Sequence, residues 1–350
     1  MGAEQVGTNR AHRRRGPSIG DVARHAGVSA QTVSRVSTGA QNVRPETRER
    51  VLASMQALGY SPNIAARALR NGSYGALGLI AHQLSRTGEA KTVEAVVEAS
   101  RENGYNVVLV DVETPSSTQM SAAVHRLTHQ SIDGLIVIRA ESSGPSTLSL
   151  PQGLPLAVAD SRVQGSPGVD TDQAGGALSA VEHLLALGHP TIHHLAGPKD
   201  SGPARQREAA WRQALETRGI RVPPVLRGDW TAASGYQLGC TAIDAARRSR
   251  SGGPHAVFAA NDEMAAGFMH ALAEHGVRVP HDVSVVGFDG LPLAEYLWPG
   301  LTTVKQDFPR IGRELVGLVM DQMDGRSPGE ERLLVPTELV VRGSTAPPHS

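Results

Sequence analysis

The sequence has very little cysteine and no long apolar run. Cys240 is the only cysteine among 350 residues, so the chain cannot form an internal disulfide and lacks companion thiols for a zinc site. No stretch approaches the roughly 20 uncharged apolar residues that a membrane-spanning helix needs. Arg13, Arg14 and Arg15 form a basic cluster with no apolar region behind it, so we expect no secretory signal, no membrane partner and a cytoplasmic location.

An excess of charge of one sign is also missing, because the formal net charge is zero. The distribution along the chain is nevertheless uneven. Residues 1–72 contain eleven Arg, no Lys and four acidic residues, or 11 − 4 = +7, which leaves 23 basic and 30 acidic residues, or −7, for the remainder. A basic N-terminal part joined to an acidic remainder predicts that the N-terminal part binds a polyanion, and nucleic acid is the natural partner.

Motifs for catalysis and for metal binding are absent from the sequence. There is no phosphate-binding loop, nucleophile elbow or His-Glu-x-x-His pattern. His189, His193 and His194 lie near one another, but alternation along a strand would point the last two to opposite faces, and no Cys or carboxylate completes a ligand set. We therefore expect no enzyme activity, no bound metal and no cofactor.

The N-terminal part reads as a chain of short helices. Residues 1–17 are polar and Arg-rich with no hydrophobic period, and we predict a disordered basic arm there. Three helical patterns follow, at Ile19–His25, Ala30–Ser37 and Pro45–Leu58. The sequence therefore predicts an all-α headpiece over residues 18–62, followed by a short helix and linker over residues 63–73.

Beyond Tyr74, short apolar runs alternate with amphipathic segments. The runs are Ala76–Ala81, Asn106–Val110, Gly134–Ile138, Leu156–Ala159, Ile192–Leu195, Ala256–Ala259 and Val283–Gly287. This alternation predicts an α/β core in which helices cover both faces of parallel sheets. Ligands bind such sheets beyond the carboxyl ends of the strands. We expect polar residues that follow the runs to converge there: Asp111, Asp160, Asn261 and Asp289.

The segment from Ile19 to Val36 has the features of a helix-turn-helix. Gly27 permits the tight turn, and the hydroxyl of Ser29 can cap the second helix. The first turn of that helix can enter a major groove, where Gln31 can read adenine and Arg35 guanine. An ordinary helical pair on an enzyme surface is the alternative. The predicted DNA-contacting residues are Ser29, Ala30, Gln31, Thr32, Ser34 and Arg35, with Thr32 and Ser34 expected to bind phosphates.

The pattern Asp-Val-Ala, Ala-Gly-Val-Ser, Thr-Val-Ser-Arg over residues 21–35 resembles the headpieces of the lactose-repressor (LacI/GalR) family. This resemblance implies that Ala30 and Gln31 largely set operator choice. The stretch from Tyr60 to Leu69 resembles the family's hinge helix, which forms when two subunits lie together on DNA, although an ordinary linker remains the alternative. The implied hinge residues that contact DNA are Asn63, Ala66, Arg67 and Leu69, with Leu69 wedged into the minor groove.

The resemblance extends over the rest of the chain. It rests on the stretches Glu182–His189, Leu195–Pro198, Gly228–Trp230, Ala260–Asp262, Val285–Asp289 and Leu301–Phe308. It implies a two-lobed core over residues 74–345 that is like periplasmic sugar-binding proteins, with doubly wound parallel sheets, three crossovers and a ligand between the lobes. Lobe one would cover about 75–173 and 305–333, and lobe two about 174–304 and 334–345, followed by a tail over 346–350.

The resemblance also implies which residues bind the ligand. The matching positions are Asp160, Arg207, Trp230, Asn261, Asp289, Gln306 and Phe308. Carboxylate, amide and guanidinium groups hold vicinal hydroxyls well, and an indole face covers the apolar side of a sugar ring. A sugar or glycoside is therefore expected, with a galactoside as the first candidate. On the side of the site that would hold the substituent of the sugar ring, polar residues stand where the lactose repressor has small or apolar ones: His82, Arg86, Glu89 and Thr92. Other glycosides and oligosaccharides therefore remain alternatives to a galactoside.

Together these observations predict a repressor that binds a palindromic operator and is released by a sugar. The residues after Val341 contain no leucine heptads, so we expect a homodimer. The first alternative is the same DNA-binding regulator responding to a non-sugar ligand or using a corepressor. A solute-binding protein, which would share the core but not the headpiece, is a remote one.

Overall fold

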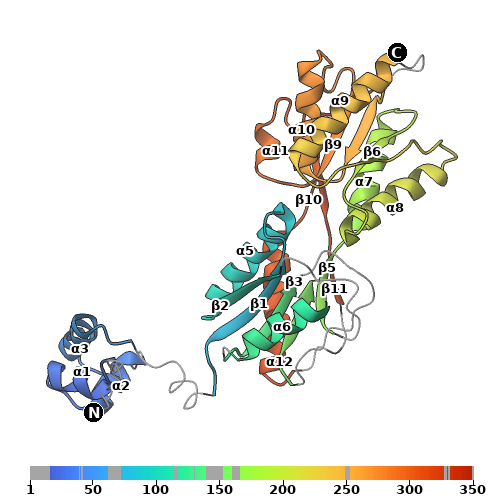
Figure 1. Ribbon diagram of the computed structural model, residues 1–350. Coiled ribbons are helices and arrows are strands. Elements are labelled where there is room, and N and C mark those ends of the chain that lie inside the picture. Colours follow the sequence, from blue (N-terminus) through green and yellow to red (C-terminus); the bar gives the residue numbers. More distant parts are fainter. Residues whose placement is uncertain are drawn as a thin grey trace, which may run out of the picture. The chain divides into compact units, whose positions relative to one another are not determined.

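A computed structural model describes residues 16–38, 40, 42–61, 72–112, 117–129, 131–138, 153–159, 166–248, 253–326, 329 and 332–348. The chain divides into two units, residues 1–74 and 75–350, and each is described by itself (Figure 1). Several sequence predictions lie outside the described residues: the basic arm up to residue 15, the hinge residues Asn63, Ala66, Arg67 and Leu69, and the ligand residue Asp160.

The first unit is an all-α headpiece. It contains α1 (Ile19–Ala26), α2 (Ala30–Ser37) and α3 (Pro45–Leu58). Ser18 and Asp21 form a reciprocal capping box at the start of α1, and Gly27 ends that helix with a φ of 62°, which favours glycine. Val22, Val33 and Val51, one from each helix, are fully buried in a shared core, so the three helices stabilise one another.

The first sheet of the second unit is entirely parallel. Its strand order is β11-β5-β4-β3-β1-β2. The strands are β1 (Ala76–His82), β2 (Asn106–Val112), β3 (Gly134–Ile138), β4 (Leu156–Ala159), β5 (Gly168–Thr171) and β11 (Arg332–Val335). Helices α5 (Thr87–Glu102) and α12 (Phe308–Met323) pack on one face, and α6 (Ser117–Thr128) packs on the other.

The second sheet has the order β12-β10-β9-β8-β6-β7, and only β12 runs antiparallel to its neighbour. The strands are β6 (His193–Ala196), β7 (Leu226–Arg227), β8 (Ala256–Ala259), β9 (Ser284–Asp289), β10 (Thr302–Lys305) and β12 (Glu338–Val340). Helices α7 (Gln173–Ala186) and α8 (Gly202–Glu216) cover one face. The other face is covered by α9 (Ala232–Arg248), α10 (Asp262–Glu274) and the short α11 (Leu293–Tyr296).

The chain passes between the two sheets three times, after Thr171, Lys305 and Val335. Figure 1 shows the last two passages in orange and red, where the chain leads from β10 to α12 and from β11 back to the second sheet. Each sheet with its helices forms one lobe. The predicted fold class, an all-α headpiece and a core of two doubly wound lobes, is confirmed.

Some details of the core differ from the sequence predictions. β2 continues through Val112, so Asp111 lies within the strand and is exposed, and the prediction that it joins a ligand site was wrong. β11 extends the first sheet to Val335, past the expected limit at residue 333, and Lys305 belongs to the second sheet. Among the described residues, no helix combines the length and apolar character needed to cross a membrane.

Candidate nucleic-acid interface and ligand cleft

The start of α2 is built as the sequence predicts. Ser29 is the N-cap, and its Oγ accepts a hydrogen bond of 3.1 Å from the backbone N–H of Thr32. Val33 and Val36 are buried against the other headpiece helices and so fix the rotation of α2.

This rotation decides which predicted DNA-contacting side chains reach solvent. Ala30, Gln31 and Arg35 are exposed, whereas Thr32 and Ser34 are half-buried. The exposed face carries an amide and a guanidinium, which are the groups that read base edges bidentately. The hydroxyl of Thr32 lies 2.9 Å from that of Ser29, so its expected contact with a phosphate competes with a local hydrogen bond.

A cleft in the second unit is lined by residues from both lobes, at the carboxyl ends of the strands. The space between its walls is about 1000 Å³, with the solvent in its open mouth included. The cleft brings together most of the ligand residues predicted from the sequence: Arg207, Trp230, Asn261, Asp289, Gln306 and Phe308.

Arg207, on α8, is the centre of a buried polar network. Its side chain is only 4% exposed. Its Nε donates to Oε1 of Gln173 at 2.8 Å, and its two terminal nitrogens donate to the carbonyl of Ala260 and to Oδ1 of Asp289, the latter at 3.3 Å. The guanidinium carbon also lies 3.6 Å from the centroid of the Phe288 ring. These contacts hold a cation in place at the base of the cleft.

Asp289 ends β9 in a backbone conformation that side chains rarely adopt, with a φ of 107°. Its Oδ1 accepts a hydrogen bond of 2.7 Å from Nε2 of Gln306. Gln306 in turn lies 3.4 Å from the amide of Gln173, a residue that the sequence did not single out. Burial raises the pKa of Asp289 to about 6, and the charge of Arg207 opposes this rise.

A second carboxylate lies near Asp289. Burial and the negative charge of Asp289 raise the pKa of Asp262 to about 7. Its two oxygens accept from the hydroxyl of Thr303 at 2.5 Å and from the backbone N–H of Leu291 at 2.7 Å. A Cβ on Gly287 would lie 2.2 Å from Oδ1 of Asp262, so a side chain there would displace this carboxylate.

Asn261 and Trp230 are connected by a hydrogen bond. Nδ2 of Asn261 donates to the Trp230 carbonyl at 2.9 Å, and Oδ1 of Asn261 caps α10 by accepting from Met264 N–H at 2.9 Å. Trp230 has a φ of 78°, and its indole packs so closely on Gly197 that a Cβ there would lie 2.5 Å from the ring. Asn261 therefore has a capping role whether or not it also contacts a ligand.

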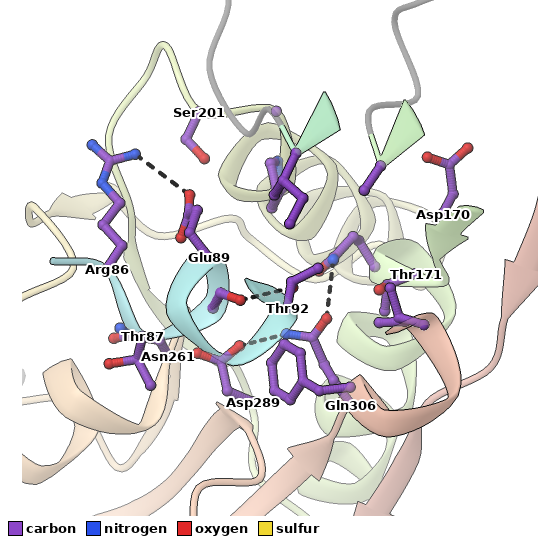
Figure 2. A pocket seen from close by; sticks show the side chains of 18 of the residues that line it. Arg86, Thr87, Glu89, Thr92, Asp170, Thr171, Ser201, Asn261, Asp289 and Gln306 are labelled. Carbon is purple, nitrogen blue, oxygen red and sulfur yellow. Dashed lines mark hydrogen bonds and ion pairs between the residues drawn. The ribbon is translucent and has the colours of Figure 1, made fainter. Parts of the chain in front are cut away.

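The first lobe contributes a different set of polar groups, from the first turns of α5. Arg86, Glu89 and Thr92 line the cleft, as expected for residues on the side that would hold the substituent of a sugar ring. Nη1 of Arg86 lies 4.0 Å from Oε1 of Glu89, and Figure 2 shows the two side chains facing each other. His82 does not line the cleft, because its Nδ1 is turned to the carbonyl of Val112 at 2.5 Å, so the expectation for that residue was wrong.

The histidines of the second lobe lie as strand alternation predicted. His194 is buried between the rings of Trp211 and Phe258, whereas His193 is half-buried. Burial lowers the pKa of His194 to about 4, so this ring is neutral. Within the described ranges, no group of three or more His, Cys, Asp or Glu side chains is placed to hold a metal ion.

A helix-turn-helix headpiece followed by a two-lobed core with a polar cleft defines the architecture of a ligand-responsive DNA-binding regulator. The comparisons agree. The sequence model for bacterial regulatory proteins of the lacI family matches residues 18–63, and the model for the periplasmic binding protein-like domain matches residues 181–345. The lactose operon repressor of Escherichia coli strain K12 is 36% identical over 94% of this chain and 91% of its own length. The chain therefore belongs to the lacI family of transcriptional regulators.

Other relatives carry different regulatory names. The transcriptional regulator CelR of Thermobifida fusca is 33% identical over 95% of this chain and 99% of its own length. Among solved structures, a lac repressor dimer bound to operator and an anti-inducer superposes with a TM-score of 0.81 at 34% identity, covering 95% of this chain and all of the other. A complex of CelR with cellobiose gives a TM-score of 0.68 at 31% identity and covers 94% and 99% of the two chains. These relatives are named as regulators, and the two structures contain different small molecules, an anti-inducer in one and cellobiose in the other.

Proposed function

We propose that this regulator is a homodimeric repressor that binds a near-palindromic operator and is released by a sugar bound in the cleft. The observation that carries the proposal is the buried network of Arg207, Asp289 and Gln306 beside the indole of Trp230. Hydroxyl groups are held by such pre-arranged charged and amide groups, and a sugar ring packs on an indole. Because the partner is operator DNA, we place its action in the cytoplasm, and we propose no catalysed reaction.

The DNA-binding half of the proposal rests on the headpiece. Two headpieces related by a dimer axis would present their α2 helices to two half-sites of a palindrome. Gln31 and Arg35 would read bases, and Ala30 would contribute to operator choice. The hinge residues Asn63, Ala66, Arg67 and Leu69 would bind at the operator centre, with Leu69 inserted into the minor groove.

The surface of the second lobe supports a dimer. Leu293, Tyr296 and Trp298 lie on and just after α11 and are 58%, 79% and 98% exposed. Large apolar side chains gathered in one short segment are typical of protein interfaces. A solved relative is described as a lac repressor dimer on its operator. We propose that this segment contributes to the dimer interface of the present chain.

The lobes are also connected by a side-chain contact that a ligand can influence. The hydroxyl of Thr87, on α5, donates to Oε1 of Glu263, on α10, at 2.5 Å. A ligand that prefers one arrangement of the lobes shifts the population of dimers toward it. If the lobe arrangement that the ligand prefers disfavours ordered hinge helices, ligand binding lowers the affinity for operator. The size of this decrease is set by the coupling free energy between the ligand site and the DNA site.

The test is fluorescence anisotropy of a labelled symmetric operator at fixed salt, repeated with a panel of mono- and disaccharides and with nucleobases. Tight binding that one sugar relieves is the expected result. Asp289→Ala should still bind the operator and lose the response to that sugar. Binding that no sugar alters, or that a nucleobase strengthens, would overturn the sugar-released repressor and favour a corepressor-dependent one.

A further inference from the structure

The chain passes between the two lobes three times, and we number these passages in chain order as the first, second and third crossovers. The first crossover is hydrogen-bonded to the third. The backbone N–H of Asp172 donates to the Val335 carbonyl at 2.9 Å, and the hydroxyl of Thr337 donates to the Asp172 carbonyl at 3.3 Å. A Cβ on Gly176 would lie 2.6 Å from Oγ1 of Thr337 and 2.8 Å from Cγ1 of Val304, in β10. The first turn of α7 is therefore in close contact with the third crossover and with the strand that leads into the second.

The first and second crossovers are joined through side chains. Gln173 is the first residue of α7, and Gln306 directly follows β10. Nε2 of Gln173 donates to Oε1 of Gln306 at 3.4 Å, while Oε1 of Gln173 accepts from Nε of Arg207 at 2.8 Å. Gln306 and Arg207 both donate to Oδ1 of Asp289, at 2.7 Å and 3.3 Å. The four side chains therefore form a closed ring of hydrogen bonds.

The partners in this ring fix the orientation of both amides. A guanidinium can only donate, so the oxygen of Gln173 faces Arg207 and its nitrogen is left for Gln306. The nitrogen of Gln306 faces Asp289, as Figure 2 shows, which leaves its oxygen for Gln173. All four side chains are buried, so water competes little for these hydrogen bonds.

The hydrogen bond between Gln173 and Gln306 is the weakest member of the ring. Its 3.4 Å is longer than the roughly 2.7–3.2 Å of an ordinary N–H···O hydrogen bond. It is also the one bond of the ring that involves no ionisable group, and hydrogen bonds to charged groups are the stronger kind. The ring is therefore most easily opened at the bond that joins the first and second crossovers.

We propose that Gln173 is a positioning residue that transmits sugar binding in the cleft to the arrangement of the lobes. A sugar hydroxyl that binds to Arg207 or Asp289 competes with the ring for the same donors and acceptors and opens the bond between Gln173 and Gln306. The first and second crossovers are then free to move relative to each other, and such connecting segments absorb the backbone changes when lobes rotate. The inference rests on the proposed function, that a sugar binds in this cleft, and adds how its binding reaches the lobes.

Two variants and a matched control test this role. Gln173→Met keeps the length of the side chain and removes both of its hydrogen bonds, and Gln173→Asn keeps the amide but shortens its reach by one methylene. The control is Gln322→Met. Oε1 of Gln322 accepts from the Leu156 N–H at 3.0 Å and its Nε2 donates to the Leu156 carbonyl at 2.7 Å, so Gln322 joins α12 to β4 within the first lobe. Its replacement removes comparable hydrogen bonds away from the second crossover, and urea unfolding shows that each variant is folded.

The first measurement is hydrogen exchange of the full-length, ligand-free protein, followed by mass spectrometry. Loss of a hydrogen bond that joins two segments should make local opening of both more frequent. We expect exchange in peptides covering residues 170–176 and 304–309 to be about fivefold faster in both Gln173 variants and unchanged in Gln322→Met. Wild-type exchange at both crossovers in the Gln173 variants would overturn the link, whether or not a sugar binds.

The second measurement is the factor by which saturating operator weakens sugar binding. It is obtained by calorimetric titration of lactose, cellobiose and maltose into the free and the operator-bound full-length chain. Coupling factors of this kind are about 5- to 150-fold, and we expect both Gln173 variants to lower the wild-type factor at least about threefold while Gln322→Met leaves it unchanged.

A residue that only contacts the ligand, or only stabilises the fold, would not change this factor. Sugar affinity that falls equally in the free and operator-bound Gln173 variants would therefore overturn the inference, while the sugar-released repressor stands. If none of the three sugars binds to the wild type and none releases operator, the proposed function fails, and the inference fails with it.

Discussion

Replacing Arg207 should lower the unfolding free energy of the two-lobed core and abolish its response to a ligand, without affecting operator binding by the folded protein. Arg207→Met keeps much of the side-chain volume but leaves the Asp289 carboxylate buried without its cation. It also removes the donors to Gln173 and to the Ala260 carbonyl. Breaking a buried ion pair by removing one partner costs about 3–5 kcal/mol of unfolding free energy. The double variant Arg207→Met, Asp289→Asn removes both charges, and its amide can still accept from Gln306.

The double variant should therefore be less destabilised than the sum of the two single variants, with a coupling free energy of about 2 kcal/mol. Trp211, Trp230 and Trp298 are the only tryptophans of the sequence, and all three belong to the second unit, residues 75–350. Urea unfolding followed by tryptophan fluorescence therefore reports on that unit and not on the headpiece. Arg212→Met is the matched control on α8. Its side chain is 44% exposed and its 3.5 Å pair with Glu208 is on the surface, so it should cost less than about 1 kcal/mol.

Both Arg207 variants should bind operator like the wild type at a temperature where they are folded, and neither should respond to the sugar. Losses that simply add in the double variant would refute the view that the two charges stabilise each other. A normal sugar response in Arg207→Met would refute its role in the cleft.

Four further predictions concern other parts of the chain. Gly197→Ala should displace the Trp230 indole and weaken sugar binding by about three- to tenfold in calorimetry, and unchanged binding would show that the ring does not contact the ligand. Burial raises the pKa of Asp262 to about 7 from an ordinary 3.8, so its ionisation destabilises the folded core as pH rises from about 4 to about 7. Asp262→Asn should therefore lose less unfolding free energy across that window than the wild type, and parallel urea-unfolding profiles would contradict this. Trp298→Asp should shift sedimentation from dimer to monomer, and an unchanged dimer would exclude the α11 segment from the interface. Leu69→Ala should weaken specific operator binding more than non-specific binding in anisotropy, and equal losses would argue against a minor-groove wedge.

The parts of the fold that follow from local chemistry were predictable. Ser29 and Gly27 are capping and turn residues, and they are found in those roles because such roles depend on the neighbouring few residues. The long buried runs of β1, β3 and β8 were visible as apolar segments bounded by polar ones. By contrast β7 and β12 have two and three residues, too few for any pattern, and they exist only because neighbouring strands pair with them.

The cleft was predictable only in part. Asn261 and Asp289 stand at strand ends, a position that general rules associate with ligands. The same rule failed for Asp111, because β2 extends one residue beyond it. Gln173 gave no signal, since its role depends on α8 bringing Arg207 within 2.8 Å of its amide oxygen. Trp230 and Phe308 were implied only by the family resemblance.

Ligand in the cleft and DNA on the headpiece should influence each other's binding. The most direct test is to titrate the sugar found in the panel into the protein, with and without saturating operator, and to follow the fluorescence of the tryptophans of the second unit. Coupling between two binding sites is reciprocal. We therefore expect operator to weaken sugar binding by the same factor by which the sugar weakens operator binding. Sugar affinity that is identical in the free and operator-bound protein would contradict it.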